Sequence, residues 1–355
     1  MRKCSLLSLA AAGLAAALSF SAHAEKKDHF NVCWTLYAGW MPWGYASTAG
    51  IVDKWADKYG ISIDVVQLND YVESINQYTV GQFDGCAMTN MDALTIPAAG
   101  GVDSTALIVS DYSNGNDGLV IKGTGKTLAD IKGMRINLVE LSVSHYFLAR
   151  ALEMAGMSER DVQVINTSDA DIVAAFSTRD VQAAATWNPM LSEIMAQPGS
   201  TKVFDSSKIP GEILDMMVVN TQTLQDNPDF GKALVGAWFE IMALMQAGTD
   251  ESTDALTEMA KASGTDLAGY QSQLATTKLF YTAEEALAFA TDPALPETMS
   301  KVAHFSFEHG ILGEGASTPD AVGMSFANEV VIGDTANVKL RFDPTYVQMA
   351  ADGKL

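Results

Sequence analysis

Short apolar runs alternate with segments of helical periodicity from residue 30 onward, and this alternation constrains the fold more than any other feature. Strand-like runs at 30–37, 61–68, 84–90 and 104–113 are separated by segments that have the pattern of helices, the first of them at 44–59. Strand–helix–strand order is typical of parallel strands with helices on both faces of the sheet. A first α/β unit is therefore predicted over about the first third of the chain.

A second series of the same kind follows, with strand-like runs at 134–141 and 181–189 around a helical segment at 142–156. From residue 221 onward the pattern is mostly helical, and no long Gly/Ser-rich linker separates the two series. We therefore expect an α/β fold of two lobes whose chain crosses twice, near 115–120 and 216–221. The predicted divisions are a first lobe of residues 25–117 and 219–355 and a second lobe of residues 118–218.

The first 24 residues have the pattern of a secretory signal. Arg2 and Lys3 precede an apolar run, which ends at the small-residue motif that closes with Ala24. Cys4 stands before the apolar run, which is the wrong place for a lipoprotein cysteine. No later stretch reaches ~18 uninterrupted apolar residues, so we expect an exported protein without a membrane span.

Charge and cysteine content limit the classes of partner. The formal net charge is −21, and loss of the signal makes it more negative. Such a chain is expected to bind no nucleic acid and to attract cationic solutes, although acidity also serves solubility alone. Cys33 and Cys86 would remain, either as a disulfide or as two buried thiols. Neither belongs to a metal-binding or redox motif, so no metal or cofactor is expected.

Aromatic, acidic and amide residues gather at the predicted carboxyl ends of strands, where ligands bind in open α/β sheets. The stretch 34–45 alone holds three of the six tryptophans and carries no charge. No Lys or Arg occupies these loops. The candidate ligand-binding residues are Tyr37, Trp40, Trp43, Asn90, Asp92, Glu140, Ser142, Trp187, Asn188 and Asp215.

Each candidate also has a purely structural interpretation. Asp92 at a helix start suits a helix cap, and Asp215 suits a hydrogen bond at a hinge. Trp187 suits an ordinary core position. Glu140 follows an apolar strand and precedes Ser142, which can itself cap the next helix, so contact with a ligand is the favoured role of Glu140.

The order of these motifs resembles a known family. The signal, the Pro42-Trp43 loop, the segment GQFDGCAMTNMDAL and the segment NLVELSVSHYFLARAL are similar to periplasmic solute-binding proteins of ABC importers, in the nitrate, sulfonate, taurine and thiamine-precursor group. The resemblance covers residues 30–330. It implies two lobes that close on a small solute, a periplasmic monomer, and a membrane permease and ATPase as partners.

Two positions depart from that family. Its members often bind anions and have Gly or Ser at the loop 140–142, where this chain has Glu140, and often a small residue at the position of Asp92. Aromatic rings with carboxylates and no basic partner suit a small planar cation, so guanidinium is the predicted solute. A similarity to binding proteins of urea carboxylase-type operons supports guanidine or urea. Urea, or a sulfonate, nitrate or thiamine precursor, is the alternative.

An enzyme of the same fold, one that makes the thiamine pyrimidine, is the rival of another class. That family uses a tight cluster of cysteines, which this chain lacks, and the motifs GxSxG, HExxH and the P-loop are also absent. We therefore expect a binding protein and not an enzyme. A receptor that binds the same solute for signalling remains equally compatible with the sequence.

Overall fold

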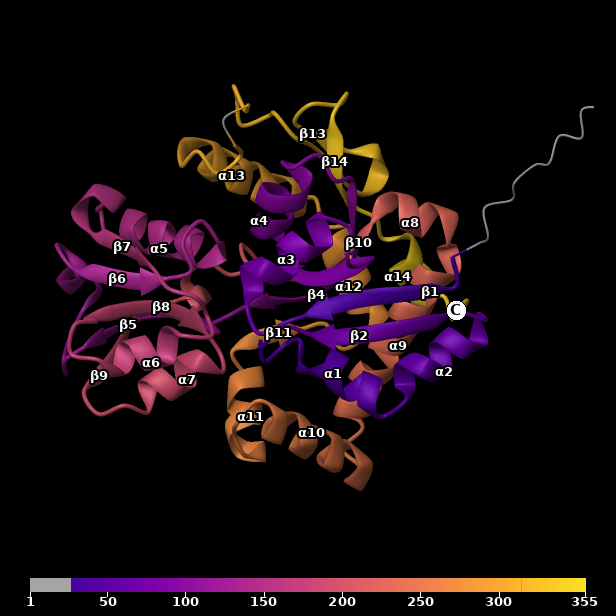
Figure 1. Ribbon diagram of the computed structural model, residues 1–355, viewed down its shortest axis with the longest axis horizontal. Coiled ribbons are helices and arrows are strands. Elements are labelled where there is room, and N and C mark those ends of the chain that lie inside the picture. Colours follow the sequence, from indigo (N-terminus) through magenta and orange to yellow (C-terminus); the bar gives the residue numbers. More distant parts are fainter. Residues whose placement is uncertain (1–26, 314) are drawn as a thin grey trace, which may run out of the picture.

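Two separate β-sheets, each covered by helices, give the chain two lobes that lie side by side (Figure 1). The computed structural model describes residues 27–313 and 315–355. The expected signal segment 1–24 lies outside the described residues. Within them, no helix combines the length and apolar character that a membrane span requires.

The larger lobe is built on a nine-stranded sheet. Its order is β13-β12-β14-β4-β10-β3-β1-β2, and β11 pairs with β4 off this path. The strands are β1 (His29–Trp34), β2 (Ser62–Gln67), β3 (Gly85–Thr89), β4 (Ser104–Ser113), β10 (Leu214–Asn220), β11 (Thr277–Leu279), β12 (Gly323–Ser325), β13 (Val331–Ile332) and β14 (Val338–Phe342). The central strand β3 is buried along its whole length, as its run of small and apolar residues predicts.

The smaller lobe has a five-stranded sheet in the order β7-β6-β8-β5-β9. Its strands are β5 (Asp117–Lys122), β6 (Arg135–Leu138), β7 (Gln163–Asn166), β8 (Ala183–Trp187) and β9 (Ser200–Asp205). Helices α5 (Val143–Met154), α6 (Ile172–Ser177) and α7 (Met190–Met195) cover it. The first of these, α5, lies within the helical segment expected over 142–156.

The chain enters the smaller lobe between β4 and β5 and returns between β9 and β10. The second crossing therefore precedes β10, whereas the sequence had placed it near 216–221. Both sheets are mixed and not purely parallel: β10 runs antiparallel to β3 and β4, and β5 runs antiparallel to β8 and β9. The reason is topological, because an outgoing and a returning strand that lie side by side must run in opposite directions.

The remaining helices surround the larger sheet. These helices are α1 (Met41–Thr48), α2 (Ile51–Lys58), α3 (Tyr71–Thr79), α4 (Asn90–Ala93), α8 (Thr221–Asp226), α9 (Pro228–Gln246), α10 (Asp250–Ala262), α11 (Leu267–Leu274), α12 (Ala283–Ala290), α13 (Ala294–Glu308) and α14 (Thr345–Ala351). The single helix expected over 44–59 is divided at Gly50, whose φ of +74° lies in the left-handed region. The final residues are part of the lobe, since β14 pairs with β4.

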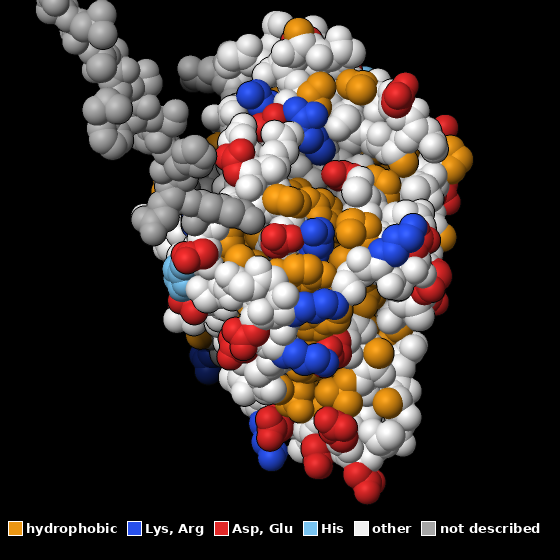
Figure 2. Space-filling model, turned by 90° about the vertical axis from the view of Figure 1, so that its right-hand side faces the viewer, with side chains coloured by type: hydrophobic (Ala, Val, Ile, Leu, Met, Phe, Trp, Pro, Cys, Tyr) orange, Lys and Arg blue, Asp and Glu red, His pale blue; other side chains and the backbone are white. Residues whose placement is uncertain are grey.

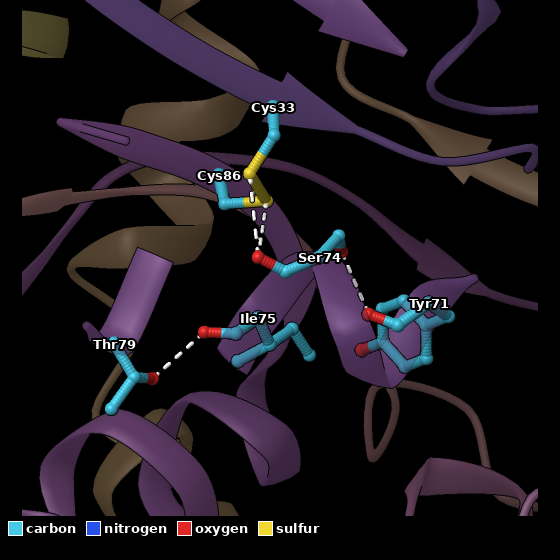
Figure 3. The surroundings of a disulfide bond; sticks show 6 residues. All are labelled: Cys33, Tyr71, Ser74, Ile75, Thr79 and Cys86. Carbon is cyan, nitrogen blue, oxygen red and sulfur yellow. Dashed lines mark hydrogen bonds between the residues drawn. A yellow bond between two sulfur atoms is a disulfide. The ribbon is translucent and has the colours of Figure 1, made fainter. Parts of the chain in front are cut away.

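A disulfide joins the first and third strands of the larger lobe. Cys33 on β1 and Cys86 on β3 are direct neighbours in the parallel register, with their Cα atoms 4.4 Å apart. Both sulfurs lie near the carbonyl oxygen of Ser74 on α3 (Figure 3). The sequence had left open whether these cysteines pair, because strand order decides it.

Candidate functional site

A small cavity lies where the two lobes meet, and both lobes line it. The larger lobe supplies the loop after β1, the start of α3, the end of β3 and the returning crossing. The smaller lobe supplies the starts of β5 and α5 and the end of β8. The lining residues are Tyr37, Trp40, Tyr71, Thr89, Asp117, Val143, Trp187, Ile213 and Asp215.

Four aromatic side chains form a continuous wall of this cavity. The ring centroids of Tyr37 and Trp40 are 5.0 Å apart in an edge-to-face arrangement. Tyr71 lies 5.9 Å from Trp40 and 5.6 Å from Trp187 by the same measure. Because Trp187 ends β8 of the smaller lobe, the wall spans both lobes. All four side chains are almost fully buried.

Two buried carboxylates complete the lining. Asp117 begins β5 and Asp215 lies near the start of β10, and they are 4% and 3% exposed. Asp117 accepts a hydrogen bond from Ser113 Oγ at 2.5 Å. No Lys or Arg is among the residues that line the cavity within the described part of the chain. Burial raises the pKa of Asp117 to about 6.

A third carboxylate, Asp111 on β4, lies behind this pair. It is fully buried and accepts hydrogen bonds from the Tyr37 hydroxyl at 2.7 Å and from Ser110 Oγ at 2.9 Å. Burial raises the pKa of Asp111 to about 6. Burial and the neighbouring Asp111 carboxylate raise the pKa of Asp215 well above its ordinary value. Three acidic groups therefore share one poorly solvated region, which favours a bound positive charge.

Asp92 is fully buried directly behind the cavity wall. Its Oδ2 accepts hydrogen bonds from the Tyr71 hydroxyl at 2.7 Å, from Thr89 Oγ1 at 2.9 Å and from the Val143 amide at 3.3 Å. Burial raises the pKa of Asp92 to about 6. Asp92 is not the cap of its own helix, since Thr89 holds that position on α4.

The aromatic stretch after β1 divides between the cavity and the core. Tyr37 and Trp40 line the cavity, whereas Trp43 packs under the loop against Trp238 of α9, with ring centroids 4.9 Å apart. This division follows from α1, which begins at Met41: residues before it form the loop, and Trp43 lies on its buried face.

Three further candidates hold the loops in place. The Asn90 side chain joins the end of β3 to the crossing, through the carbonyl of Glu212 and the amide of Leu214. The Asn188 side chain bonds Thr276 and Ser192. Ser142 caps α5 by accepting a hydrogen bond from Ser144 N. None of the three is among the lining residues.

Glu140 lies outside the site. Its side chain is exposed, and its backbone amide donates a hydrogen bond to Asn166 Oδ1 at 3.0 Å. The next residue, Leu141, has a φ of +61°, so the chain turns sharply between β6 and α5. The expectation that Glu140 contacts a ligand does not agree with this placement.

Sequence reasoning missed Tyr71 and Asp117. Tyr71 begins the helix that follows β2, so the rule that ligands lie beyond carboxyl ends would have included it. Asp117 begins a strand instead of ending one, because β5 starts at the crossing, and no sequence signal marked it. Thr89, Val143 and Ile213 are small or apolar and also carried no signal.

Direct contacts join the lobes around the cavity. The indole N–H of Trp187 donates to the carbonyl of Leu36 at 3.0 Å, and the amide of Ala38 donates to the carbonyl of Asn188 at 3.2 Å. His309, the residue that follows α13, lies 2.6 Å from Glu159 of the smaller lobe. The structure therefore corresponds to a closed arrangement of the lobes.

Basic side chains gather at the end of the larger lobe that is farthest from the smaller lobe. Figure 2 faces this end and shows Lys and Arg side chains along its middle with acidic side chains beside them. Lys54 of α2 pairs with Glu240 of α9 at 2.7 Å, and Lys354 pairs with Asp352 at 2.8 Å. Lys54 and Lys354 are therefore partnered, and neither lines the cavity.

Several solved structures have the same fold as this chain. The alkanesulfonate-binding protein of Xanthomonas axonopodis pv. citri, solved bound to MOPS, is 16% identical to this chain with a TM-score of 0.67, and the match covers 82% of this chain and 96% of that one. The aliphatic sulphonate-binding protein of Escherichia coli gives 19% identity and a TM-score of 0.66. The fold is thus the two-lobed α/β fold of periplasmic binding proteins.

Comparison of the sequence with known proteins agrees with this fold. A Brucella abortus (strain 2308) protein named as a binding protein without a stated ligand is 28% identical over 218 residues, which are 60% of this chain and 66% of that protein. The taurine-binding periplasmic protein of Escherichia coli (strain K12) is 27% identical over 144 residues, 39% of this chain and 44% of its own. The sequence profile of the family described as NMT1/THI5 like matches residues 53–251, more than half of the chain. The chain belongs to the NMT1/THI5 like family.

Proposed function

We propose that this protein is the solute-binding component of an ABC importer and that it captures a small planar cation, with guanidinium as the best fit. The observation that carries the proposal is a buried cavity whose lining, among the described residues, has two carboxylates, four aromatic rings and no basic side chain. The family and the fold support a binding role in import. Export through the 1–24 signal, a periplasmic location and docking on a permease and ATPase belong to the same proposal.

The chemistry of the lining suits a guanidinium ion. Its N–H groups point outward in one plane, so they can donate to Asp117 and Asp215 together. Its flat faces are free to lie against rings such as Trp40 and Trp187, and a desolvated cation–π contact is worth ~0.5–2 kcal/mol. The small size of the cavity also limits the solute to a few non-hydrogen atoms.

Urea is the second candidate, and one observation favours it. The indole N–H of Trp40, which lines the cavity, is buried without a hydrogen-bond partner among the described residues. Urea offers a carbonyl oxygen to such a donor, whereas guanidinium offers only donors. Against urea, three ionisable carboxyl groups are more than a neutral solute requires. A sulfonate or taurine is the solute that the names of relatives suggest, and buried carboxylates oppose it.

A thermal-shift panel tests this proposal. Guanidinium, methylguanidine, agmatine, urea, taurine and nitrate are compared at millimolar concentration and constant ionic strength. A ligand present at 100 times its dissociation constant stabilises the folded state by ~2.7 kcal/mol. We expect guanidinium to raise the melting temperature in a saturable way. A saturable rise with taurine or nitrate, and none with guanidinium or urea, would reject the cation site.

A further inference from the structure

Asp92 reaches from one lobe to a helix terminus of the other. It lies on α4 of the larger lobe, and its Oδ2 accepts a hydrogen bond from the amide of Val143 at 3.3 Å. Val143 is the first residue of the twelve-residue helix α5 of the smaller lobe. A carboxylate of one lobe thus neutralises the N-terminus of a helix that belongs to the other.

The amides of the first three residues of α5 all have acceptors in this arrangement. The amide of Ser144 donates to Ser142 Oγ at 3.2 Å, and that of His145 donates to the Ser142 carbonyl at 2.9 Å. The remaining amide, that of Val143, donates to Asp92. Helix N-termini attract anions because their first amides lack partners and the helix dipole is positive there. At α5 the Asp92 carboxylate has taken that place.

This carboxylate lies directly behind the wall of the proposed site. Tyr71, Thr89 and Val143, whose groups donate to Asp92, all line the cavity. The second oxygen, Oδ1, is buried without a partner among the described residues. A buried carboxylate with an unpartnered oxygen repels any other anion that approaches the same donors.

A second carboxylate makes the mirror-image contact and provides a comparison. Asp169 of the smaller lobe is 5% exposed, and its Oδ1 accepts a hydrogen bond from the amide of Tyr71 at 3.2 Å. Tyr71 is the first residue of α3 in the larger lobe. Each lobe therefore caps a helix of the other, but Asp169 has only one donor from the cavity lining, the backbone of Tyr71, whereas Asp92 has three.

We propose that Asp92 is a specificity-determining residue that acts as a built-in anion: it occupies the N-terminus of α5 across the cleft and so excludes anionic solutes from the cavity. The inference rests on the proposed solute-binding function. It explains how the site is closed to the sulfonates that the names of several relatives mention. Asp169 serves only to hold the lobes together.

The test is to remove the built-in anion and offer a replacement. In Asp92→Ala, formate or nitrate should fill the vacated space and accept the hydrogen bonds of Tyr71, Thr89 and Val143. We expect each anion to raise the melting temperature of Asp92→Ala saturably, with chloride holding the ionic strength constant. The dissociation constant of Asp92→Ala for each anion should be at least about tenfold lower than that of the parent protein, because the helix terminus and the freed donors become available.

Two controls separate this effect from a general loss of negative charge. Asp169→Ala removes the matched carboxylate and should gain no affinity for formate or nitrate. Adding Val143→Pro to Asp92→Ala removes the helix amide at the first position of α5, where proline is well tolerated. The double variant should lose most of the anion affinity that Asp92→Ala gains.

The outcomes are decisive either way. If Asp92→Ala does not fold, Asp92→Ser serves the same test, because its small hydroxyl can still accept a hydrogen bond. Formate and nitrate that stabilise the parent or Asp169→Ala as strongly as the Asp92 variant would overturn the proposal, and so would an Asp92 variant that gains nothing. These readouts use no guanidinium, so failure of the proposed solute leaves them interpretable.

Discussion

At the scale of single residues, three buried carboxyl groups around the cavity have no basic partner in the part of the chain that the structure describes. Asp111, Asp117 and Asp215 are each less than 5% exposed around one cavity. Ionised groups in such a region are destabilising unless hydrogen bonds or a counter-charge compensate. Hydroxyl donors such as Tyr37 and Ser113 supply part of that compensation. A cationic solute would supply the rest.

Replacing Asp117 should therefore weaken binding of the solute. Asp117→Asn keeps the shape of the side chain but removes its charge, and loss of one member of a desolvated charge pair costs ~2–5 kcal/mol, about 30-fold or more in dissociation constant. Glu140→Gln is the matched control, because Glu140 is exposed and its side chain lies outside the cavity. Calorimetric titration with guanidinium measures both. Equal losses in the two variants would contradict the placement of the site.

The acidity of Asp117 predicts a pH dependence of both stability and binding. Its pKa is raised from 3.8 to about 6 in the folded protein, so the folded state holds more protons than the unfolded state between these values. The contribution of Asp117 to the stability of the unliganded protein is therefore fully present below pH ~4 and is lost as the pH rises through ~6. Guanidinium needs the ionised form, so its affinity should rise about tenfold from pH 5 to pH 7.

Titrations at several pH values check this dependence. The difference between the parent and Asp117→Asn isolates the contribution of Asp117 from that of other titrating groups. An affinity of the parent that falls from pH 5 to pH 7 would contradict the ionised carboxylate as the partner of the solute.

The sequence identified some of the residues that line the cavity but not others. The rule of carboxyl ends led to Tyr37, Trp40, Trp187 and Asp215, all of which line the cavity. It led to Glu140 as well, because the sequence does not reveal that the chain turns at Leu141 and points this side chain to solvent. Asp117 was invisible, since its position depends on where the chain crosses between lobes.

At the scale of elements, the disulfide between β1 and β3 fixes the strand whose end carries the aromatic loop. Replacing both Cys33 and Cys86 by Ser should lower the free energy of unfolding by about 2–4 kcal/mol, because the unfolded chain gains entropy. Urea denaturation of the parent, with and without a reductant, measures this loss. The double variant should not respond to reductant, and a parent that is equally stable in both conditions would contradict the contribution of the bond.

Element types were predictable because their apolar patterns are local. The strands before residue 221 and helices such as α5 and α9 lie where the sequence pattern placed them, whereas the short strands β11 to β14 fall in the segment that was expected to be mostly helical. Strand direction was not predictable in the same way: β10 is antiparallel to its neighbours because it returns from the other lobe. The same dependence on distant chain segments explains why the pairing of Cys33 with Cys86 had to wait for the structure.

At the scale of the whole molecule, the cavity exists only while the lobes are together, since its lining comes from both. A solute that contacts both lobes favours the closed state over the open one. Small-angle scattering of the parent should show a smaller radius of gyration at saturating guanidinium. Asp117→Asn at the same concentration should keep the larger radius. An identical radius in the parent with and without solute would contradict closure by this ligand.

The cavity between the lobes is proposed to accept a small planar cation and to exclude anions. Calorimetric titration of the parent protein at pH 7 with guanidinium, and separately with taurine, tests it most directly. We expect saturable binding of one guanidinium per chain and no detectable heat of binding from taurine. Saturable binding of taurine, with none of guanidinium, would contradict a cation site and make this chain a binder of the solute class that its relatives' names describe.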